Sequence, residues 1–298
     1  MQLDVNYLNE ILIFVIFACS LNLLMGYAGQ VSVAHGAFAA FGGYALAYLF
    51  LNDKFDTLAG LGVGIGAAAL AGLVVGFPAL RLRTEWLILL TLAAQIIVIE
   101  LTMTLSNFGG TYGLQNVAGL SVFGHHLLLP TDMLPLFAAC AVLVFLLCWR
   151  LGESPYGRVL RAIREDEGAC RSLGKNVYAY KLTIFAITAA MAGLGGALYV
   201  VTLQISSPAL FSFDLSTAII AMVIFGGMGN LFGSVLGATI LTLLTPLFEN
   251  VLDFTTAKAA IWRLIAYGIV LVVVIMVRPQ GLLPEGAAPI RFVRQRVA

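Results

Sequence analysis

The sequence contains little charge. Only 10% of its 298 residues are Asp, Glu, Lys or Arg, while 61% are hydrophobic and the mean hydropathy is +0.99. Soluble domains carry about 25% charged residues, so this composition excludes a soluble domain. Several apolar runs approach or exceed the roughly 20 residues that an α-helix needs to cross the hydrocarbon core, and none alternates like an outer-membrane barrel strand. The expected fold class is all-α, a polytopic membrane helix bundle.

Three further absences narrow the function. The sequence has no G-x-x-x-x-G-K-[ST] motif, so the chain is not expected to hydrolyse ATP or to act as an enzyme by itself. Its four cysteines lack C-x-x-C spacing, which argues against a disulfide or a metal site. The first ten residues, MQLDVNYLNE, contain no Lys or Arg, so a cleavable signal peptide is not expected.

Apolar runs separated by polar breaks predict nine candidate membrane helices. They cover residues 8–25, 31–51, 58–80, 86–105, 132–149, 182–203, 215–228, 231–248 and 259–277. We therefore expect about eight or nine spans that form a single transmembrane domain over residues 1–298.

The basic residues predict the orientation of the chain. Of the 16 Lys and Arg residues, 13 fall in three groups: Arg81 and Arg83, seven residues from Arg150 to Lys181, and four from Arg278 to Arg296. Cytoplasmic loops carry an excess of Lys and Arg, so the loop at 153–181 and the tail at 279–298 are expected in the cytoplasm and the amino terminus outside. Residues 215–248 must then cross an even number of times, as two pieces or as a re-entrant hairpin.

Two glycine-rich breaks interrupt the apolar runs. GYAGQ at 26–30 and GGMGN at 226–230 both read G-x-x-G-amide. Matching breaks in two halves of a chain are typical of transporters built from repeats, in which discontinuous helices border the substrate path. The alternative is a chance match, because the chain has 31 glycines. The candidate hinge glycines are Gly26, Gly29, Gly226, Gly227 and Gly229.

Several polar residues lie within or beside the predicted spans. Gln30, Ser32 and His35 follow the first break and should face the protein interior, because polar groups in lipid need partners. They line a pathway or gate in one interpretation and only brace the helices in the other. Glu100 is the one carboxylate deep in a span, which makes it a candidate pathway residue, although it could also reach water at the outer end.

An unusually polar segment begins at Ser154. Ser154 and Pro155 have the pattern of a helix N-cap and first residue. An apolar stripe follows at helical spacing, with arginines elsewhere on the helix surface. The stripe is Tyr156, Val159, Leu160 and Ile163, and the arginines are Arg158, Arg161 and Arg164. Such a helix either lies on the membrane surface or presents a face to another protein.

Five blocks of the sequence resemble the permeases of ATP-binding-cassette (ABC) transporters of the branched-chain amino acid class. The segment from 153 to 192, with GRVLRAIRED, an A-x-x-LG turn and YKL, is similar to the cytoplasmic loop of that family. Further similar blocks are GYAGQVSVAHGAFAAFGGYA (26–45), FPALRLRTEWLILLTLAAQ (77–95), AGLGGALY with ISSP (192–208), and IFGGMGNLFGSVLGA (224–238). ALRLR and the YKL block are similar to the M-type rather than the H-type permease.

The resemblance implies a transmembrane subunit of a binding-protein-dependent importer in the inner membrane. Its implied partners are a second permease, expected to be a different H-type chain, two cytoplasmic ATPases that bind ATP and Mg, and an extracytoplasmic substrate-binding protein; no nucleic acid is implied. The helix after Ser154 would be the coupling helix, whose stripe enters a cleft of an ATPase while its arginines meet acidic residues at the rim. Energy would enter the permease through that helix.

Two departures from the family pattern leave the solute open. The usual TGGPNGL loop reads FGGTYGLQNV at 108–117, and Gln95 stands where an acidic residue is common. Gln95 joins the candidate pathway residues. The expected solute is small and polar, above all a branched-chain amino acid, with urea or short amides and aromatic or other organic acids as alternatives. An ion-coupled secondary transporter or a channel-like subunit is the alternative from another class.

Overall fold

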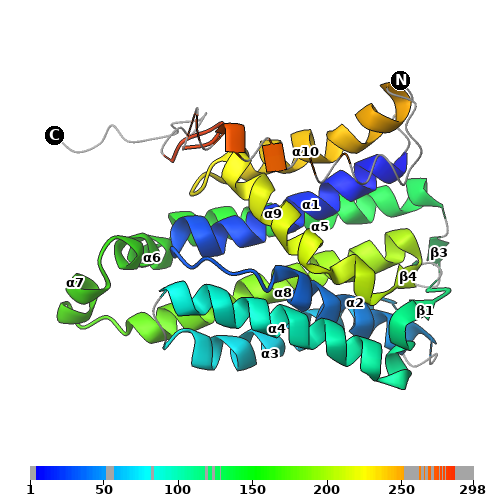
Figure 1. Cartoon of the computed structure of the whole chain (residues 1–298), viewed down its shortest axis with the longest axis horizontal. Coiled ribbons are helices and arrows are strands. Elements are labelled where there is room, and N and C mark those ends of the chain that lie inside the picture. Colours follow the sequence, from blue (N-terminus) through cyan, green and yellow to red (C-terminus); the bar gives the residue numbers. More distant parts are fainter. Residues whose placement is uncertain are drawn as a thin grey trace.

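The structure is a computed structural model. It describes residues 5–51, 57–81, 84–117, 120–122, 125–127 and 129–251, followed by 262, 265, 268–269, 272–274, 276, 278 and 280–285. The long helices run lengthwise beside one another, with α6 and α7 at one end of the bundle and the short strands at the other (Figure 1). We call these the α6 end and the strand end.

The helices follow the predicted spans closely. They are α1 (Val5–Asn22) with the π-helical turn η1 (Leu23–Tyr27), α2 (His35–Leu51), α3 (Thr57–Ala79), α4 (Thr84–Thr104), α5 (Pro130–Glu153), α6 (Pro155–Glu165), α7 (Glu167–Ser172), α8 (Val177–Leu203), α9 (Phe213–Gly226) and α10 (Leu231–Val251). Among the described residues, six helical segments are long and apolar enough to cross a membrane, and α2 and α10 contribute shorter apolar segments. The predicted membrane helix bundle is thereby confirmed, while the span at 259–277 lies mostly outside the described residues.

Short strands occur at the strand end, beside the single-turn 3-10 helices η2 (Ser106–Phe108), η3 (Gly110–Tyr112) and η4 (Pro208–Phe211). β1 (Leu114–Gln115) pairs antiparallel with β4 (Ile205–Ser206), and β2 (Leu120–Val122) pairs antiparallel with β3 (His125–Leu127). The β1–β4 pair ties the loop after α4 to the loop after α8. These two strand pairs are not part of the all-helical prediction. They form because backbone groups outside the helices also need hydrogen-bond partners, and here they find them in other loops.

Small residues let α2, α3 and α8 approach one another closely. A Cβ atom on Gly42 of α2 would overlap the carbonyl oxygen of Gly193 of α8, and a Cβ on Gly196 would overlap the carbonyl oxygen of Ala39. A Cβ on Gly64 of α3 would lie 2.8 Å from the carbonyl oxygen of Gly42. Because lipid gives no hydrophobic drive for helix association, such close packing contributes much of the stability. These three helices form the tightly packed centre of the bundle.

Both predicted breaks occur in the structure. α1 unwinds through η1, and Gly29 takes a φ of 67° before α2 begins at His35. α9 ends at Gly226, and the chain turns with φ angles of 121° at Gly227 and 82° at Gly229 before α10 begins. α9 and α10 pack against each other, and Figure 1 shows them running from the turn back toward the strand end. This agrees with the two pieces expected for residues 215–248.

Gly42→Ala should destabilise the protein, because its methyl group has no space against the backbone of α8. We expect the free energy of unfolding to fall by about 1–3 kcal/mol, as for other overpacked cores. Gly66→Ala on α3 is the matched control, since a Cβ there meets no atom within 4 Å and alanine favours a helix by about 0.5–1 kcal/mol over glycine. Thermal unfolding in detergent would measure both variants, and equal melting temperatures would contradict the packing assignment.

Candidate coupling and gating site

α6 begins as the sequence predicts. The Ser154 hydroxyl oxygen accepts a hydrogen bond from the amide of Gly157 at 3.2 Å, and Pro155 occupies the first helical position, where no amide hydrogen is needed. The helix ends at Glu165, and Asp166 then caps α7 by accepting from the amide of Ala169 at 3.0 Å. Two successive caps thus produce a short helical corner that projects at the α6 end of the bundle (Figure 1).

The apolar stripe of α6 faces the chain's own bundle, which corrects the expected docking face. Leu160 is fully buried and Ile163 is 1% exposed, and Ile163 packs with Cys170 and Val177. The Val159 side chain joins the same cluster. A side chain already covered by its own chain cannot also fill a cleft in a partner. The stripe therefore attaches α6 to the bundle, and the exposed face carries Arg158, Ala162 and Glu165 instead.

Tyr156, the first residue of the stripe, also contacts the bundle of its own chain, through Tyr180 of α8. Its hydroxyl donates to the carbonyl oxygen of Tyr180 at 2.8 Å, and the two rings stack with their centroids 5.1 Å apart. Burial raises the pKa of Tyr156 to about 12. Tyr156 therefore stays protonated and able to donate throughout the physiological pH range.

The three arginines of α6 take different directions. Arg161 donates to the carbonyl oxygen of Gly152 at 2.5 Å, pairs with Glu153 at 3.1 Å, and lies over the Tyr27 ring at 4.9 Å. Arg164 donates to the carbonyl oxygen of Gly26 and pairs with Glu285 at 2.7 Å. Arg158 is exposed. Two of the expected docking arginines thus bind this chain, and both reach the segment that follows α1.

The two glycine breaks meet each other. The Asn22 side chain accepts from the amide of Gly229 and donates to the carbonyl oxygen of Asn230, each at 2.8 Å. A Cβ on Gly26 would overlap both the Asn22 oxygen and the Gly229 amide. We call Asn22, Gly26, Gly229 and Asn230 the break junction. The glycines are among the residues predicted from the sequence and Asn22 is not, although an asparagine within an apolar run is a visible signal.

Residues 280–285, which we call the strap, lie across the second break. The amides of Leu282 and Leu283 donate to the carbonyl oxygens of Phe225 and Gly226 at 2.9 and 3.0 Å. The Asn230 side chain donates to the carbonyl oxygen of Pro284 at 3.2 Å. The strap ends at Glu285, the partner of Arg164. This part of the expected cytoplasmic tail is therefore integrated into the site.

The hinge candidates occupy these contacts with little free space. A Cβ on Gly29 would lie 2.6 Å from Cγ of Arg164, and one on Gly229 would lie 2.9 Å from Cδ of Glu285. Gly226 ends α9 against the backbone of Gly233, and Gly227 lies against the carbonyl oxygen of Leu283. Glycine is thus required at the junction for close approach as well as for its positive φ angles. A hinge motion at these positions stays a prediction.

The polar residues after the first break are buried, as expected. His35 Nε2 lies 3.2 Å from the Ser20 hydroxyl, and the Ser32 hydroxyl accepts from the amide of Ala34 at 3.3 Å. Gln30 is 2% exposed, and neither of its amide atoms has a partner among the described residues. Ser32 and His35 brace the break, whereas Gln30 is left for another role. Their part in a pathway stays a prediction.

Gln95 holds the start of α2 in place. Its carbonyl oxygen accepts from the amide of Ala37 at 2.6 Å and from the Ser216 hydroxyl at 3.3 Å, and its NH₂ group donates to the carbonyl oxygen of Phe211 at 2.6 Å. A carboxylate could not donate that last bond, which accounts for glutamine at this position. Glu100 lies elsewhere, on an exposed face of α4. The structure does not bring Gln95 and Glu100 together at one site.

Comparison with known proteins identifies the family. The sequence model of the family described as branched-chain amino acid transport system / permease component matches residues 4–275. The chain belongs to this family. The high-affinity branched-chain amino acid transport system permease protein LivM of Salmonella typhimurium is 32% identical over an alignment 310 residues long, gaps included, that covers 94% of this chain and 70% of the relative. No solved structure matches the chain.

Two further relatives show the range of similarity. The probable branched-chain amino acid transport permease protein LivM of Methanocaldococcus jannaschii is 28% identical over an alignment 315 residues long, gaps included, that covers 92% of this chain and 91% of the relative. The ribose import permease protein RbsC of Escherichia coli is 24% identical over an alignment 245 residues long that covers 79% of this chain and 74% of the relative. The chain is thus a non-enzymatic permease component and a multi-pass membrane protein.

Asn22→Leu should destabilise the permease by about 2–4 kcal/mol, because it leaves two buried backbone groups of the second break without partners. Thr188→Val is the matched control. The Thr188 hydroxyl is also buried, but it donates only to the carbonyl oxygen of Phe185 in its own helix, so its loss should cost less. Thermal unfolding in detergent would measure both, and a larger loss in the control would rule out the junction as a stabilising contact.

Arg164→Gln and Glu285→Gln should each weaken the link between α6 and the strap, and their effects should not add. The pair is partly exposed, with 25% and 36% of the side chains accessible, so we expect a coupling free energy of about 0.5–1 kcal/mol. A double-mutant cycle on the free energy of unfolding would measure it. Strictly additive losses would show that the ion pair contributes nothing.

Proposed function

We propose that the permease is the M-type transmembrane subunit of an ATP-binding-cassette importer that carries branched-chain amino acids across the inner membrane. The family membership and the relatives named as branched-chain amino acid permeases support this proposal. The observation that carries it furthest is the projecting α6, which is capped at its start, attached by its apolar stripe and exposed along one polar face.

The proposal places the α6 end in the cytoplasm. That end carries Arg81, the α6–α7 arginines and Arg278, as expected from the excess of basic residues in cytoplasmic loops. α1 begins at the strand end (Figure 1), while the strap contacts α6. The described parts of the two termini therefore lie at opposite ends, which agrees with an outside amino terminus and a cytoplasmic carboxyl-terminal tail.

The mechanism follows from how α6 is connected. A movement of α6, imposed by ATPases that bind and hydrolyse ATP with Mg, would pull on Arg164 and thereby on the backbone of Gly26 and on Glu285. Gly26 belongs to the first break, and Glu285 ends the strap on the second. Both discontinuous helices would move together, which is the kind of rocking that opens a pathway alternately to the two sides.

The partners proposed here are a second, H-type permease, two ATPases and an extracytoplasmic substrate-binding protein. The exposed face of α6, with Arg158, Ala162 and Glu165, is the surface offered to an ATPase. The solute is the least constrained part of the proposal, because a ribose import permease is also a relative. Thermal-shift screening of the associated binding protein against branched-chain amino acids, ribose, urea, amides and aromatic acids would identify it.

Ala162→Arg should abolish recovery of the ATPase when the permease is co-expressed with its partners and purified in mild detergent. The new side chain projects from the exposed face and would separate the two surfaces, while the permease itself has room to accept it. Its melting temperature should stay within about 2 °C of the unaltered chain, since surface substitutions cost little. Leu160→Asp is the contrasting variant, which should unfold the α6 attachment. Full recovery of the ATPase with Ala162→Arg would contradict the assignment of this face of α6 as the ATPase-binding surface.

A further inference from the structure

A cavity of about 550 Å³ lies between the α6–α7 corner and the bundle. Its walls come from the first break, the turn after α3, the start of α4, the α6–α7 corner and the start of α8. Its lining includes Gln30, Leu80, Leu87, Asp166, Arg171 and Lys181. Cavities of about 300–1,000 Å³ are the usual size for small-molecule sites.

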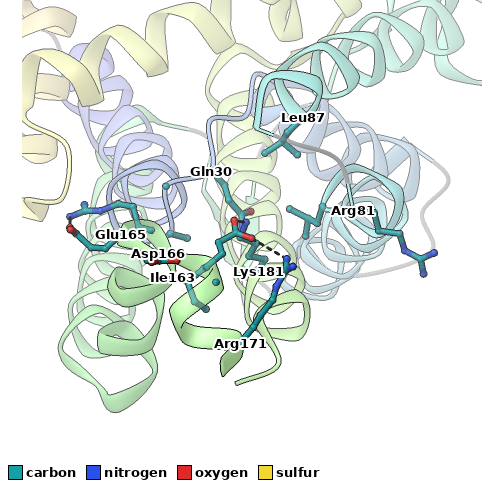
Figure 2. Close-up of a pocket in the computed structure, with 14 residues that line it drawn as sticks. Gln30, Arg81, Leu87, Ile163, Glu165, Asp166, Arg171 and Lys181 are labelled. Carbon is teal, nitrogen blue, oxygen red and sulfur yellow. Dashed lines mark hydrogen bonds and ion pairs between the residues drawn. The ribbon is translucent and has the colours of Figure 1, made fainter. Parts of the chain in front are cut away.

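Gln30 points into this cavity without a partner. Figure 2 shows its side chain directed toward Lys181, with Leu87 on the opposite wall. The residue is 2% exposed, and neither its oxygen nor its nitrogen is bonded among the described residues. A buried amide that lacks both donor and acceptor partners is costly and calls for a bound group. The amide therefore marks the cavity as a place where something polar binds.

The charges around the cavity favour a bound carboxylate. Lys181 and Arg171 both pair with Glu167, Arg171 at 3.3 Å. Glu167 is the one carboxylate that pairs with these two cations, so one positive charge is left over beside it, while Arg164 of the same lining pairs with Glu165 at 3.5 Å. Arg81 does not add to it, because its guanidinium points away from the cavity (Figure 2) and lies 4.4 Å from the Phe77 ring centroid. A ligand carboxylate beside Lys181 and Arg171 would neutralise the remaining positive charge.

The other walls favour an ammonium and an aliphatic group. Asp166 borders the cavity and is exposed, and one of its oxygens already accepts from the amide of Ala169. Its negative charge would attract an ammonium. Leu80 and Leu87 give the cavity an aliphatic part of its wall. The cavity thus combines a positive site, a negative site and an aliphatic wall around one free amide.

We propose that this cavity is a cytoplasmic binding site for an aliphatic α-amino acid in its zwitterionic form, with the carboxylate near Lys181 and Arg171 and the ammonium near Asp166. The inference rests on the proposed function for the cytoplasmic placement and for the amino acid as cargo. A ligand held there would bridge the α6–α7 corner and the rest of the bundle. Imported amino acid that accumulates inside would therefore hold α6 in one position and slow further import.

The complete transporter in liposomes, with the α6 end and ATP inside and binding protein with L-leucine outside, provides the test. We expect luminal L-leucine to lower the initial import rate several-fold, whereas leucinamide and 4-methylpentanoate, which each lack one charge, should need roughly ten-fold higher concentrations. Arg171→Gln should relieve the inhibition and keep the empty-lumen rate within about two-fold, because Arg171 is an exposed residue in a weak ion pair. Lys175→Gln, an equal loss of charge outside the cavity, should stay inhibited.

Titration of L-leucine into the purified transporter without binding protein tests Gln30 directly. Gln30→Leu should weaken binding by about ten-fold without lowering the melting temperature of the unliganded protein, because its amide holds no partner in the chain. The proposal is overturned if luminal leucine leaves the import rate unchanged, if Arg171→Gln stays inhibited, or if Gln30→Leu binds leucine normally, as it would if only water filled the cavity. Absence of import with an empty lumen would refute the proposed function. The leucine titration would still show whether the cavity binds the amino acid.

Discussion

The arrangement depends on satisfying the backbone groups that two interrupted helices release inside a membrane protein. Each break frees amides and carbonyl oxygens that are buried within the protein and need hydrogen-bond partners there. Asn22 offers one acceptor and one donor, which are the two functions that Gly229 and Asn230 need. The strap satisfies two further carbonyl oxygens at the end of α9. The breaks are stable because each is covered by a distant part of the chain.

The bundle thus has two kinds of contact, close backbone packing in one part and polar side-chain links in another. α2, α3 and α8 touch through backbone atoms at glycines, which leaves no room for one to slide over another. The break junction, the strap and α6 are joined instead by side-chain hydrogen bonds and one ion pair. Such polar links can exchange with little repacking, so conformational change is expected among them rather than among α2, α3 and α8.

The sequence predicted the helices, the two breaks and the start of α6, because apolar run length, glycine and Ser-Pro are local signals. It did not predict that the breaks touch, since 207 residues separate Asn22 from Gly229. It also assigned the face of α6 wrongly. Helical spacing shows that Leu160 and Ile163 share a side, but the pattern is the same whether that side packs on the chain itself or on a partner. Only their burial distinguishes the two cases.

Arginine at position 164 illustrates how chemistry constrains the link to α6. Its guanidinium reaches the carbonyl oxygen of Gly26 with Nη1 and the carboxylate of Glu285 with Nη2. A planar fork can bind two acceptors in different directions at once, whereas the ammonium of lysine is a single compact charge at the end of a flexible stem. One side chain thereby joins α6 to both breaks. Because Gly29 has no Cβ, the aliphatic part of the Arg164 side chain can pack against the first break, so the glycine and the arginine together determine how closely α6 approaches that break.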